Sequence, residues 1–322
     1  MKRVVVITTG GTIATRRGPM VGGSVPTLKG EELLALLPRD GIDLAFEEFS
    51  NLPSSHLTPA NALELSQKVE AVLLSPDVDG VVITHGSDTL EETAYLLDLT
   101  LKAGKPVVIT GAMRTAASSG YDGVVNLANA IRVAAAAESR DLGTLVVFDE
   151  EIHAAAAVQM LFTQARRAFA SPDSGPLGRI EGQRIVWHQR PINRLYIPCV
   201  HLELMVDLLR LSQGADQRQL RHSIDDGAAG IVIETFGSGR VPPWWIPLIS
   251  EAISRRSTVV ITSRCLVGGL GDEYGYVGAY HDLQRLGVLF ANHLSGPKAR
   301  IKLMVALGAA RSVRDLKAWF TA

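Results

Sequence analysis

The chain has 322 residues, of which 47% are hydrophobic and 20% are charged. This composition is typical of a globular protein with a large buried core, and it excludes a disordered chain, which needs low hydrophobicity and high net charge. The 32 basic and 33 acidic residues give a net charge of -1, so no overall field attracts nucleic acid or an anionic membrane surface.

The cysteine content and the start of the chain bear on its location. Cys199 and Cys265 are too few for a disulfide framework, which favours a reducing compartment. The apolar run at residues 4–7 is too short for the core of a signal peptide and is followed by a Thr-Thr-Gly-Gly sequence. No apolar stretch is long enough to span a bilayer. These features predict a cytoplasmic protein that does not act at a membrane.

Strands and helices alternate in the first half of the chain. Apolar, β-branched runs predict buried parallel strands at residues 4–7, 81–84, 107–110 and 145–148. The helices between them are predicted at residues 59–74, 92–102 and 124–137. The first follows an N-cap and first-turn proline at Thr58-Pro59, and the second follows the capping-box spacing from Asp88 to Glu91. This alternation predicts an open parallel α/β sheet with right-handed crossovers.

The pattern changes in the second half. Residues 179–185, with Glu181-Gly182 at their centre, predict a hairpin, and Pro191 and Pro198 mark a linker. A second α/β unit follows, with strands expected at residues 200–204, 230–234 and 259–263 and a last helix at residues 297–307. We therefore predict a larger N-terminal α/β domain over residues 1–190. Residues 191–322 would form the linker and a smaller C-terminal α/β domain.

Ligands of open parallel sheets bind beyond the carboxyl ends of the strands. Each of the first three predicted strands ends in glycines and hydroxyl or acidic residues, which allow a ligand to approach the backbone and offer a nucleophile or a donor. These loops are Thr8-Thr9-Gly10-Gly11-Thr12, Thr84-His85-Gly86-Ser87-Asp88 and Thr110-Gly111-Ala112-Met113-Arg114. Together they predict a small polar pocket at one edge of the sheet.

Each of these residues also has a structural interpretation. Thr12, Ser87 and Asp88 taken singly are ordinary capping residues, and His85 is either a base or a residue that anchors its loop. The Gly10-Gly11 pair lacks the G-x-G-x-x-G spacing of a dinucleotide site, and no lysine follows it as in a P-loop. The histidines and cysteines show no metal-ligand spacing, so no metal is predicted.

Two stretches change this balance when they are taken together. Thr9-Gly10-Gly11-Thr12-Ile13-Ala14 and His85-Gly86-Ser87-Asp88-Thr89-Leu90-Glu91-Glu92 resemble the two signature motifs of the bacterial-type L-asparaginase/glutaminase family. The resemblance continues, in the family's order, through 110–114, Asp122-Gly123 with Asn126, 175–178 and 297–300. It implies a flavodoxin-like N-terminal domain, a smaller C-terminal α/β domain, no cofactor, and tetramers, so we expect a homodimer or homotetramer. Active sites would form between one subunit's N-terminal domain and its partner's C-terminal domain.

The resemblance also implies roles for individual residues. Thr12 matches the family's nucleophile, Ser87 stands where a second catalytic threonine is usual, and Asp88 matches the aspartate that holds the substrate's amino group. Ser54 matches a serine that contacts the substrate's carboxylate, and Ser55 stands where many members have glutamine. The same pocket would be lined by Gly11, Gly86 and Ala112. Asp272, Glu273 and Tyr274 would be supplied by a partner subunit.

Two positions depart from the family pattern. The lid after the first motif carries a tyrosine in the family, but residues 16–24 contain none and the first tyrosine of the chain is Tyr95. A lysine completes the second triad in the family, whereas an ungapped count back from residues 175–178 places Met160 there. Because no lysine occurs between Lys105 and Lys298, a shift in register cannot restore it.

Two main hypotheses follow from these residues. In the first, the chain is an L-asparagine amidohydrolase: Thr12 attacks the carboxamide, an acyl-enzyme forms, and water releases L-aspartate, with L-glutamine as a weaker substrate. In the second, it is a catalytically impaired protein of the same fold that binds a small amino acid, an interpretation that Met160 favours. A third, a subunit that deamidates charged tRNA, is opposed by the net charge of -1.

Overall fold

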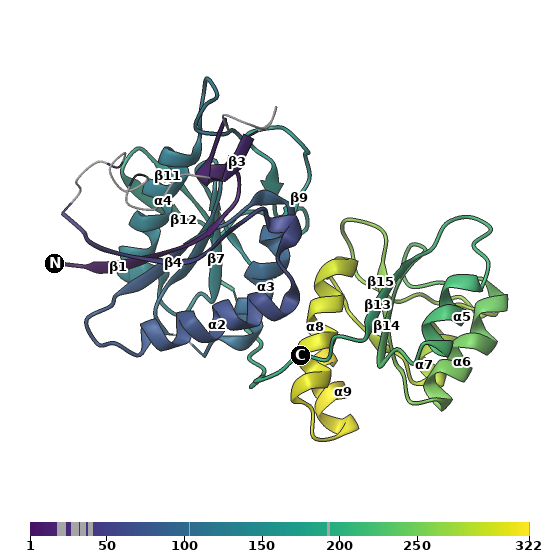
Figure 1. Ribbon diagram of the computed structural model, residues 1–322. Helices are drawn as coiled ribbons and strands as arrows, with labels where there is room; N and C mark the ends of the chain where they lie inside the picture. The colour runs from purple at the N-terminus through teal and green to yellow at the C-terminus, as the bar shows by residue number, and fades with distance from the viewer. Residues whose placement is uncertain are drawn as a thin grey trace. The chain divides into compact units, whose positions relative to one another are not determined.

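The computed structural model describes residues 1–17, 24–26, 32, 37, 41–102, 104–191 and 194–321. The chain divides into two compact units, Met1–Tyr196 and Ile197–Ala322 (Figure 1). Each unit has its own sheet and its own hydrophobic core.

The first unit is built on an eight-stranded sheet with the order β12-β11-β8-β7-β6-β5-β1-β4. Strands β4, β1, β5, β6 and β7 run parallel, while β8, β11 and β12 extend the sheet in antiparallel fashion. The strands are β1 (Arg3–Gly10), β4 (Asp43–Leu52), β5 (Gly80–Thr84), β6 (Val107–Thr110), β7 (Thr144–Phe148), β8 (Glu151–Ala154), β11 (Gly178–Glu181) and β12 (Arg184–Trp187). The predicted parallel strands are confirmed, as is the hairpin formed by β11 and β12.

Helices cover both faces of this sheet. Every residue of β5, β6 and β7 is buried, as expected for strands with apolar side chains on both sides. The helices are α2 (Pro59–Leu73), α3 (Leu90–Thr100) and α4 (Gly123–Ala135). Thr58 caps α2 as predicted, because its hydroxyl accepts from Asn61 N and the Asn61 side chain accepts from Thr58 N.

Helices α3 and α4 connect β5 to β6 and β6 to β7, two steps in the same direction across the sheet. They lie on opposite faces: α4 shares a core with Val4, Val82 and Val108, whereas α3 packs beside α2 (Figure 1). The two crossovers therefore have opposite hands, and the expectation of right-handed crossovers throughout is wrong for one of them. The physical reason is the length of the 111–122 loop between β6 and α4. It lets the chain pass the carboxyl ends of the strands and reach the other face before α4 begins.

The second unit has a parallel sheet in the order β13-β14-β15-β16. Helix α8 packs against β13, β14 and β15, and Figure 1 shows α5, α6 and α7 on the opposite face. The strands are β13 (Val206–Arg210), β14 (Gly230–Thr235), β15 (Thr258–Ser263) and β16 (Leu289–Phe290). The helices are α5 (Arg218–Asp225), α6 (Ile246–Ser254), α7 (Tyr280–Leu286), α8 (Gly296–Ala309) and α9 (Val313–Thr321).

Two predictions for the second unit are wrong. The strand expected at residues 200–204 is not formed; Val200 and Leu204 are exposed and the strand begins at Val206. β13 is an edge strand, so it tolerates Asp207 and lacks the continuous apolar run that identifies a central strand. The helix expected to be last is followed by α9. Polar residues interrupt the apolar ones in this helix, and its buried side is made by Leu316 and Phe320.

The smaller elements are short. Strands β2 (Thr15–Arg17) and β3 (Ser24–Pro26) form an antiparallel pair after the first motif, and β9 (Gln159–Met160) pairs with β10 (Phe169–Ala170). Within the described ranges, no helix is both long and apolar enough to cross a membrane.

Candidate active site

The strand order points to the space beyond β1 and β5 as the expected ligand position. Counted in chain order, the parallel strands β4-β1-β5-β6-β7 have the flavodoxin-like order 2-1-3-4-5. The direction of the order reverses between β1 and β5, and ligands of such sheets bind at that point, beyond the carboxyl ends of the strands. The first motif follows β1 and the second follows β5, so Thr12 and Ser87 stand on the two sides of this switch point.

Glycines bring the three predicted loops into backbone contact. Gly11 has a positive φ of 81°, and a Cβ built on it would lie 2.4 Å from Gly86 Cα. A Cβ on Gly111 would lie 2.5 Å from the carbonyl oxygen of His85. A larger residue at Gly11 or Gly111 would therefore push the loops apart. The loops meet as the sequence predicts, although the glycines pack on one another as well as opening space for a ligand.

Thr12 opens a short 3-10 turn, Thr12–Ala14, directly after the Gly10-Gly11 bend. The turn is fixed by its backbone: Gly11 N donates to Leu52 O at 3.1 Å, and Ala14 N donates to Gly11 O at 3.1 Å. The Thr15 hydroxyl donates to Gly11 O at 2.8 Å. Thr12 itself is half-buried, and no described residue forms a hydrogen bond with its hydroxyl. The backbone that carries this hydroxyl is therefore held in place by bonds that do not involve the Thr12 side chain.

The second motif forms another 3-10 turn, Ser87–Thr89, before α3 begins at Leu90. Ser87 is buried and Asp88 is exposed. The capping box predicted from Asp88 to Glu91 is wrong, because Thr89 occupies the N-cap position and makes no side-chain cap bond. The extra 3-10 turn separates Asp88 from the helix.

Ser54 lies against the second motif. It is 2% exposed, and a Cβ on Gly86 would be only 2.6 Å from its hydroxyl oxygen. The Thr89 hydroxyl donates to Ser54 O at 2.9 Å, which joins the two turns. The Ser54 hydroxyl is buried and has no hydrogen-bond partner in the described part of the chain. An unpaired buried hydroxyl is costly, so a polar ligand group reaching it would be favoured. The neighbouring Ser55 is exposed.

The third loop is fixed by Asp122 and Asn126. The buried Asp122 carboxylate accepts from Met113 N at 3.0 Å and from Arg114 N at 2.9 Å. The Asn126 side chain donates to Gly111 O at 3.0 Å. Ala112, between these anchors, is fully buried. The loop is thus attached to the start of α4 at both of its ends.

The structure brings Met160 next to the second motif. The backbone N of Met160 donates to the Glu91 carboxylate at 2.7 Å, and Glu91 is three residues after Asp88. Pairing with Phe169 fixes the strand register at Met160. Its side chain is half-buried and carries only a weakly accepting thioether, which cannot act as a base. The contact of Glu91 with the Met160 backbone is one that the sequence analysis missed.

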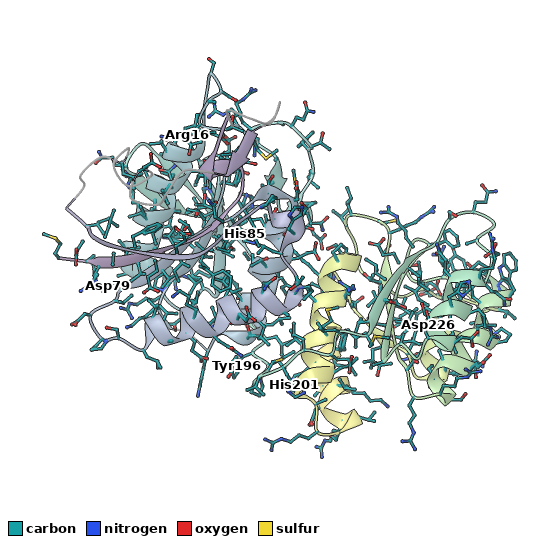
Figure 2. The ribbon with its side chains drawn as sticks, viewed as in Figure 1. Arg16, Asp79, His85, Tyr196, His201 and Asp226 are labelled. Atoms are coloured by element: carbon teal, nitrogen blue, oxygen red, sulfur yellow. The ribbon has the colours of Figure 1, made fainter. Side chains whose placement is uncertain are left out.

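His85 is buried at the end of β5 (Figure 2). Its Nδ1 lies 2.8 Å from Gly86 O, and its Nε2 has no hydrogen-bond partner among the described residues. Burial lowers the pKa of His85 to about 4, with a smaller opposing effect of the Gly86 carbonyl. The side chain is therefore neutral at neutral pH, which favours the anchoring interpretation.

This burial predicts a stability loss in mild acid. Because the unfolded His85 titrates near pH 6.5 and the folded one near pH 4, only the unfolded state gains a proton between these values. The free energy of unfolding should fall as the pH is lowered from about 6.5 to about 4. Thermal unfolding at a series of pH values should show a shallower Tm decline in His85→Gln than in the parent. The exposed His188→Gln should keep the parent slope, and equal slopes in all three proteins would contradict the assignment.

The predicted partner residues lie in the second unit, in the loop after β15. Asp272 is already paired: Arg240 Nε lies 2.8 Å from its carboxylate, and the Arg240 guanidinium lies 4.7 Å from the Tyr274 ring centroid. Glu273 and Tyr274 are exposed. Arg240 was missed by sequence reasoning, which had no local pattern to indicate this pairing.

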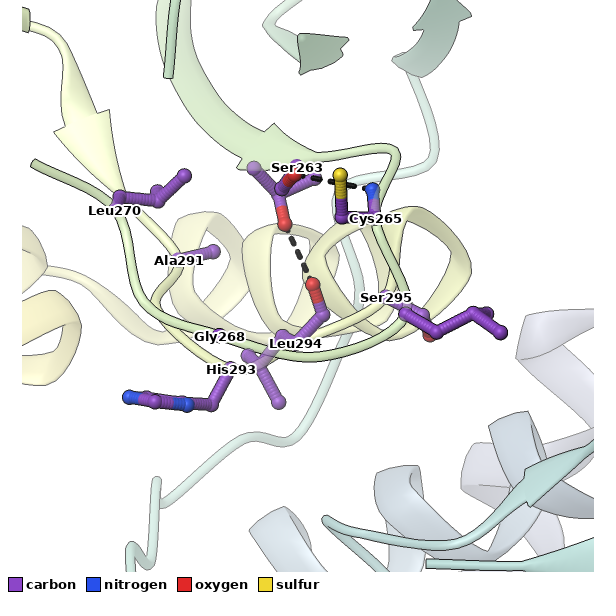
Figure 3. Close-up of a pocket in the computed structure, with 10 residues that line it drawn as sticks. Ser263, Cys265, Gly268, Leu270, Ala291, His293, Leu294 and Ser295 are labelled. Carbon is purple, nitrogen blue, oxygen red and sulfur yellow. Dashed lines mark hydrogen bonds between the residues drawn. The ribbon is translucent and has the colours of Figure 1, made fainter. Parts of the chain in front are cut away.

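A separate pocket lies at the carboxyl ends of β15 and β16, and it contains none of the predicted site residues (Figure 3). Two of its hydroxyls are used in backbone contacts, since Thr262 donates to Leu294 O and Ser263 donates to Gly237 O. The buried Ser295 hydroxyl oxygen has no hydrogen-bond partner among the described residues. Among the described residues, no group of three or more His, Cys, Asp or Glu side chains could hold a metal ion. Residues 18–23 of the expected lid lie outside the described residues.

Fold and site together define a two-unit, flavodoxin-like α/β protein with hydroxyl-bearing loops at its switch point. The family model "Asparaginase, N-terminal" matches residues 3–193, and "Glutaminase/Asparaginase C-terminal domain" matches residues 205–320. The chain belongs to the asparaginase/glutaminase family.

Similar proteins match over nearly the full length. An L-asparaginase of Bacillus licheniformis is 35% identical, covering 96% of each chain, and a probable L-asparaginase of Deinococcus radiodurans is 37% identical, covering 100% of this chain and 98% of its own. The crystal structure of a probable cytoplasmic L-asparaginase from Campylobacter jejuni aligns with a TM-score of 0.88 at 30% identity. That alignment covers 100% of this chain and 99% of the other.

Proposed function

We propose that this protein is an L-asparagine amidohydrolase, which converts L-asparagine and water into L-aspartate and ammonia. The observation that carries the proposal is the placement of Thr12 at the switch point, with its turn packed against the Gly86-Ser87-Asp88 loop. Family membership and the names of the full-length relatives support the same reaction.

The nucleophile, the oxyanion donors and the groups that bind the substrate's charges each have a suitable residue at this edge of the sheet. The Thr12 hydroxyl oxygen attacks the amide carbon, and the C–N bond breaks as the hydroxyl proton passes to the nitrogen that leaves as ammonia. Water then hydrolyses the acyl-enzyme to L-aspartate and restores the Thr12 hydroxyl. Backbone N–H groups near Thr12 and Ser87 stabilise the tetrahedral oxygen in both steps. Asp88 binds the α-ammonium group, and the unpartnered Ser54 hydroxyl binds the α-carboxylate. Gly11, Gly86, Ala112 and Ser55 complete the lining in this proposal.

Ammonia release from L-asparagine and L-glutamine, measured side by side, tests the proposal. We expect release from asparagine, with slower release from glutamine. Aspartate should appear in equal amount to the ammonia. Binding of aspartate with no ammonia from either amide would overturn the proposal.

That outcome would favour a second candidate function, a protein of this fold that binds a small amino acid with little turnover. The observation behind it is Met160, whose backbone is attached to Glu91 beside the second motif but whose side chain offers no base. Both candidates act on a free amino acid. In both, the protein works in the cytoplasm.

We further propose that the active protein is a homodimer or homotetramer in which a partner's loop completes each site. Because the Asp272 carboxylate is engaged by Arg240 in its own chain, Glu273 is the better candidate for reaching the substrate's ammonium in a neighbouring subunit. Tyr274, exposed beside it, would contact the same ligand.

Subunit mixing tests this assembly. Thr12→Ala and Glu273→Gln should each be weakly active alone. When the two variants are co-expressed, their subunits should form mixed dimers. In a mixed dimer one active site carries both changes and the other carries neither. Random pairing then restores about a quarter of the parent's sites. A monomer in sedimentation, or no gain on mixing, would contradict the proposal.

A further inference from the structure

A tyrosine from a distant segment contacts the turn that carries Thr12. The Tyr121 hydroxyl donates to Ile13 O at 2.6 Å, across a sequence separation of 108 residues. Ile13 is the residue after Thr12. The other bonds described for this turn come from Leu52 and from the turn's own residues and Thr15, so Tyr121 ties it to the start of α4.

The surroundings of Tyr121 are shaped to hold its ring in this position. Gly123 begins α4, and a Cβ built on it would lie 2.4 Å from the Tyr121 hydroxyl oxygen and 2.5 Å from two ring carbons. Any larger residue at Gly123 would displace the ring. Glycine is unfavourable within helices, so its presence at this position is explained by the space that Tyr121 needs.

The hydroxyl acts as a donor. Partial burial, assisted by the neighbouring Asp122, raises the pKa of Tyr121 well above its ordinary value, although Arg16 opposes this. Its proton is directed at a carbonyl oxygen. Tyr121 therefore binds the backbone of the Thr12 turn through Ile13 O, and it is not placed to accept a proton from a nucleophile.

The next residue holds the facing loop. Asp122 accepts hydrogen bonds from Met113 N and Arg114 N, while Tyr121 binds the turn of Thr12. A further bond joins the same two segments, because Ala116 N donates to Thr15 O at 3.1 Å. Adjacent residues thus fix the positions of the Thr12 turn and the Gly111–Arg114 loop relative to the start of α4.

We propose that Tyr121 is a positioning residue for the reaction: its hydroxyl bond to Ile13 O sets the orientation of the Thr12 nucleophile relative to the Gly111–Arg114 loop. The inference rests on the proposed function, since it assumes that Thr12 reacts. Small displacements of a nucleophile reduce the rate without removing any chemical group, so the effect should be on kcat.

Tyr121→Phe removes only the hydroxyl. We expect kcat for asparagine to fall about 3- to 10-fold, the equivalent of one net hydrogen bond, with KM changed less than twofold. The ratio of variant to parent kcat should be constant from pH 6 to 9, because no proton transfer is lost. Gly123→Ala should produce a similar loss, and the two changes together should be less than additive, since both break the same bond.

Tyr95→Phe is the matched control. Tyr95 is a buried tyrosine of the first unit that has no described bond to the Thr12 turn, so loss of its hydroxyl should lower Tm while kcat per folded molecule stays at the parent value. If Tyr121→Phe lowers Tm alone and leaves kcat unchanged, the residue is merely structural and the inference fails while the proposed function stands. If its kcat loss depends on pH, a proton-transfer role replaces positioning. An inactive parent would remove the proposed function and this inference together.

Discussion

Replacing Thr12 with alanine should reduce asparagine hydrolysis by at least about 10³-fold, because loss of the nucleophile of a covalent mechanism leaves only the contributions of binding and oxyanion stabilisation. The fold should survive. Leu52 O, Gly11 and Thr15 hold the turn through bonds that do not involve the Thr12 side chain. Ammonia release measures the loss, while Tm and calorimetric binding of aspartate should stay near the parent values.

Thr12→Ser is the control for this change. It keeps a hydroxyl on the same turn and loses one methyl group, so part of the activity should remain. Parent-level turnover in Thr12→Ala would show that another group attacks the amide. A large drop in Tm together with the rate would mean that the turn depends on the threonine for its structure.

The central strands of the first unit could be predicted because their environment is uniform. β5, β6 and β7 are buried on both faces, and apolar residues make up most of each sequence. β4, at the edge of the sheet, has the sequence DLAFEEFSNL and is only half-buried, so it was not identified. The crossover of opposite hand was missed for a different reason: it depends on how the 111–122 loop is anchored, and no local pattern encodes that path.

The site shows the same division between local and long-range information. The glycines of the predicted loops indicated that backbone could approach closely there. The structure brings these loops together at Gly11, Gly86 and Gly111. The capping box failed because the 3-10 turn Ser87–Thr89 puts Thr89 at the N-cap of α3. Glu91 instead accepts from Met160 N, 69 residues away in the chain. The Tyr121 contact with Ile13 spans 108 residues and likewise leaves no mark in either local sequence.

Met160→Lys should raise turnover by something approaching the ~10²–10⁴-fold that a positioned acid–base group contributes. The backbone of residue 160 is fixed, because its N donates to Glu91 at 2.7 Å and its strand pairs with Phe169. A side chain of similar length can therefore replace the thioether with little change in Tm. The new amine would take the proton from Ser87 and hold Asp88 in place.

The pH dependence and a control separate proton transfer from packing. A lysine accepts a proton only when neutral, so the gain should increase as the pH is raised towards its pKa, and it should require an ionised Asp88. Met160→Leu restores no base and should behave like the parent. An equal gain in Met160→Leu and Met160→Lys would assign the effect to packing. An unchanged rate in Met160→Lys, with the parent active, would mean that Thr12 is activated without a second triad in this protein, so that the methionine is compatible with full turnover.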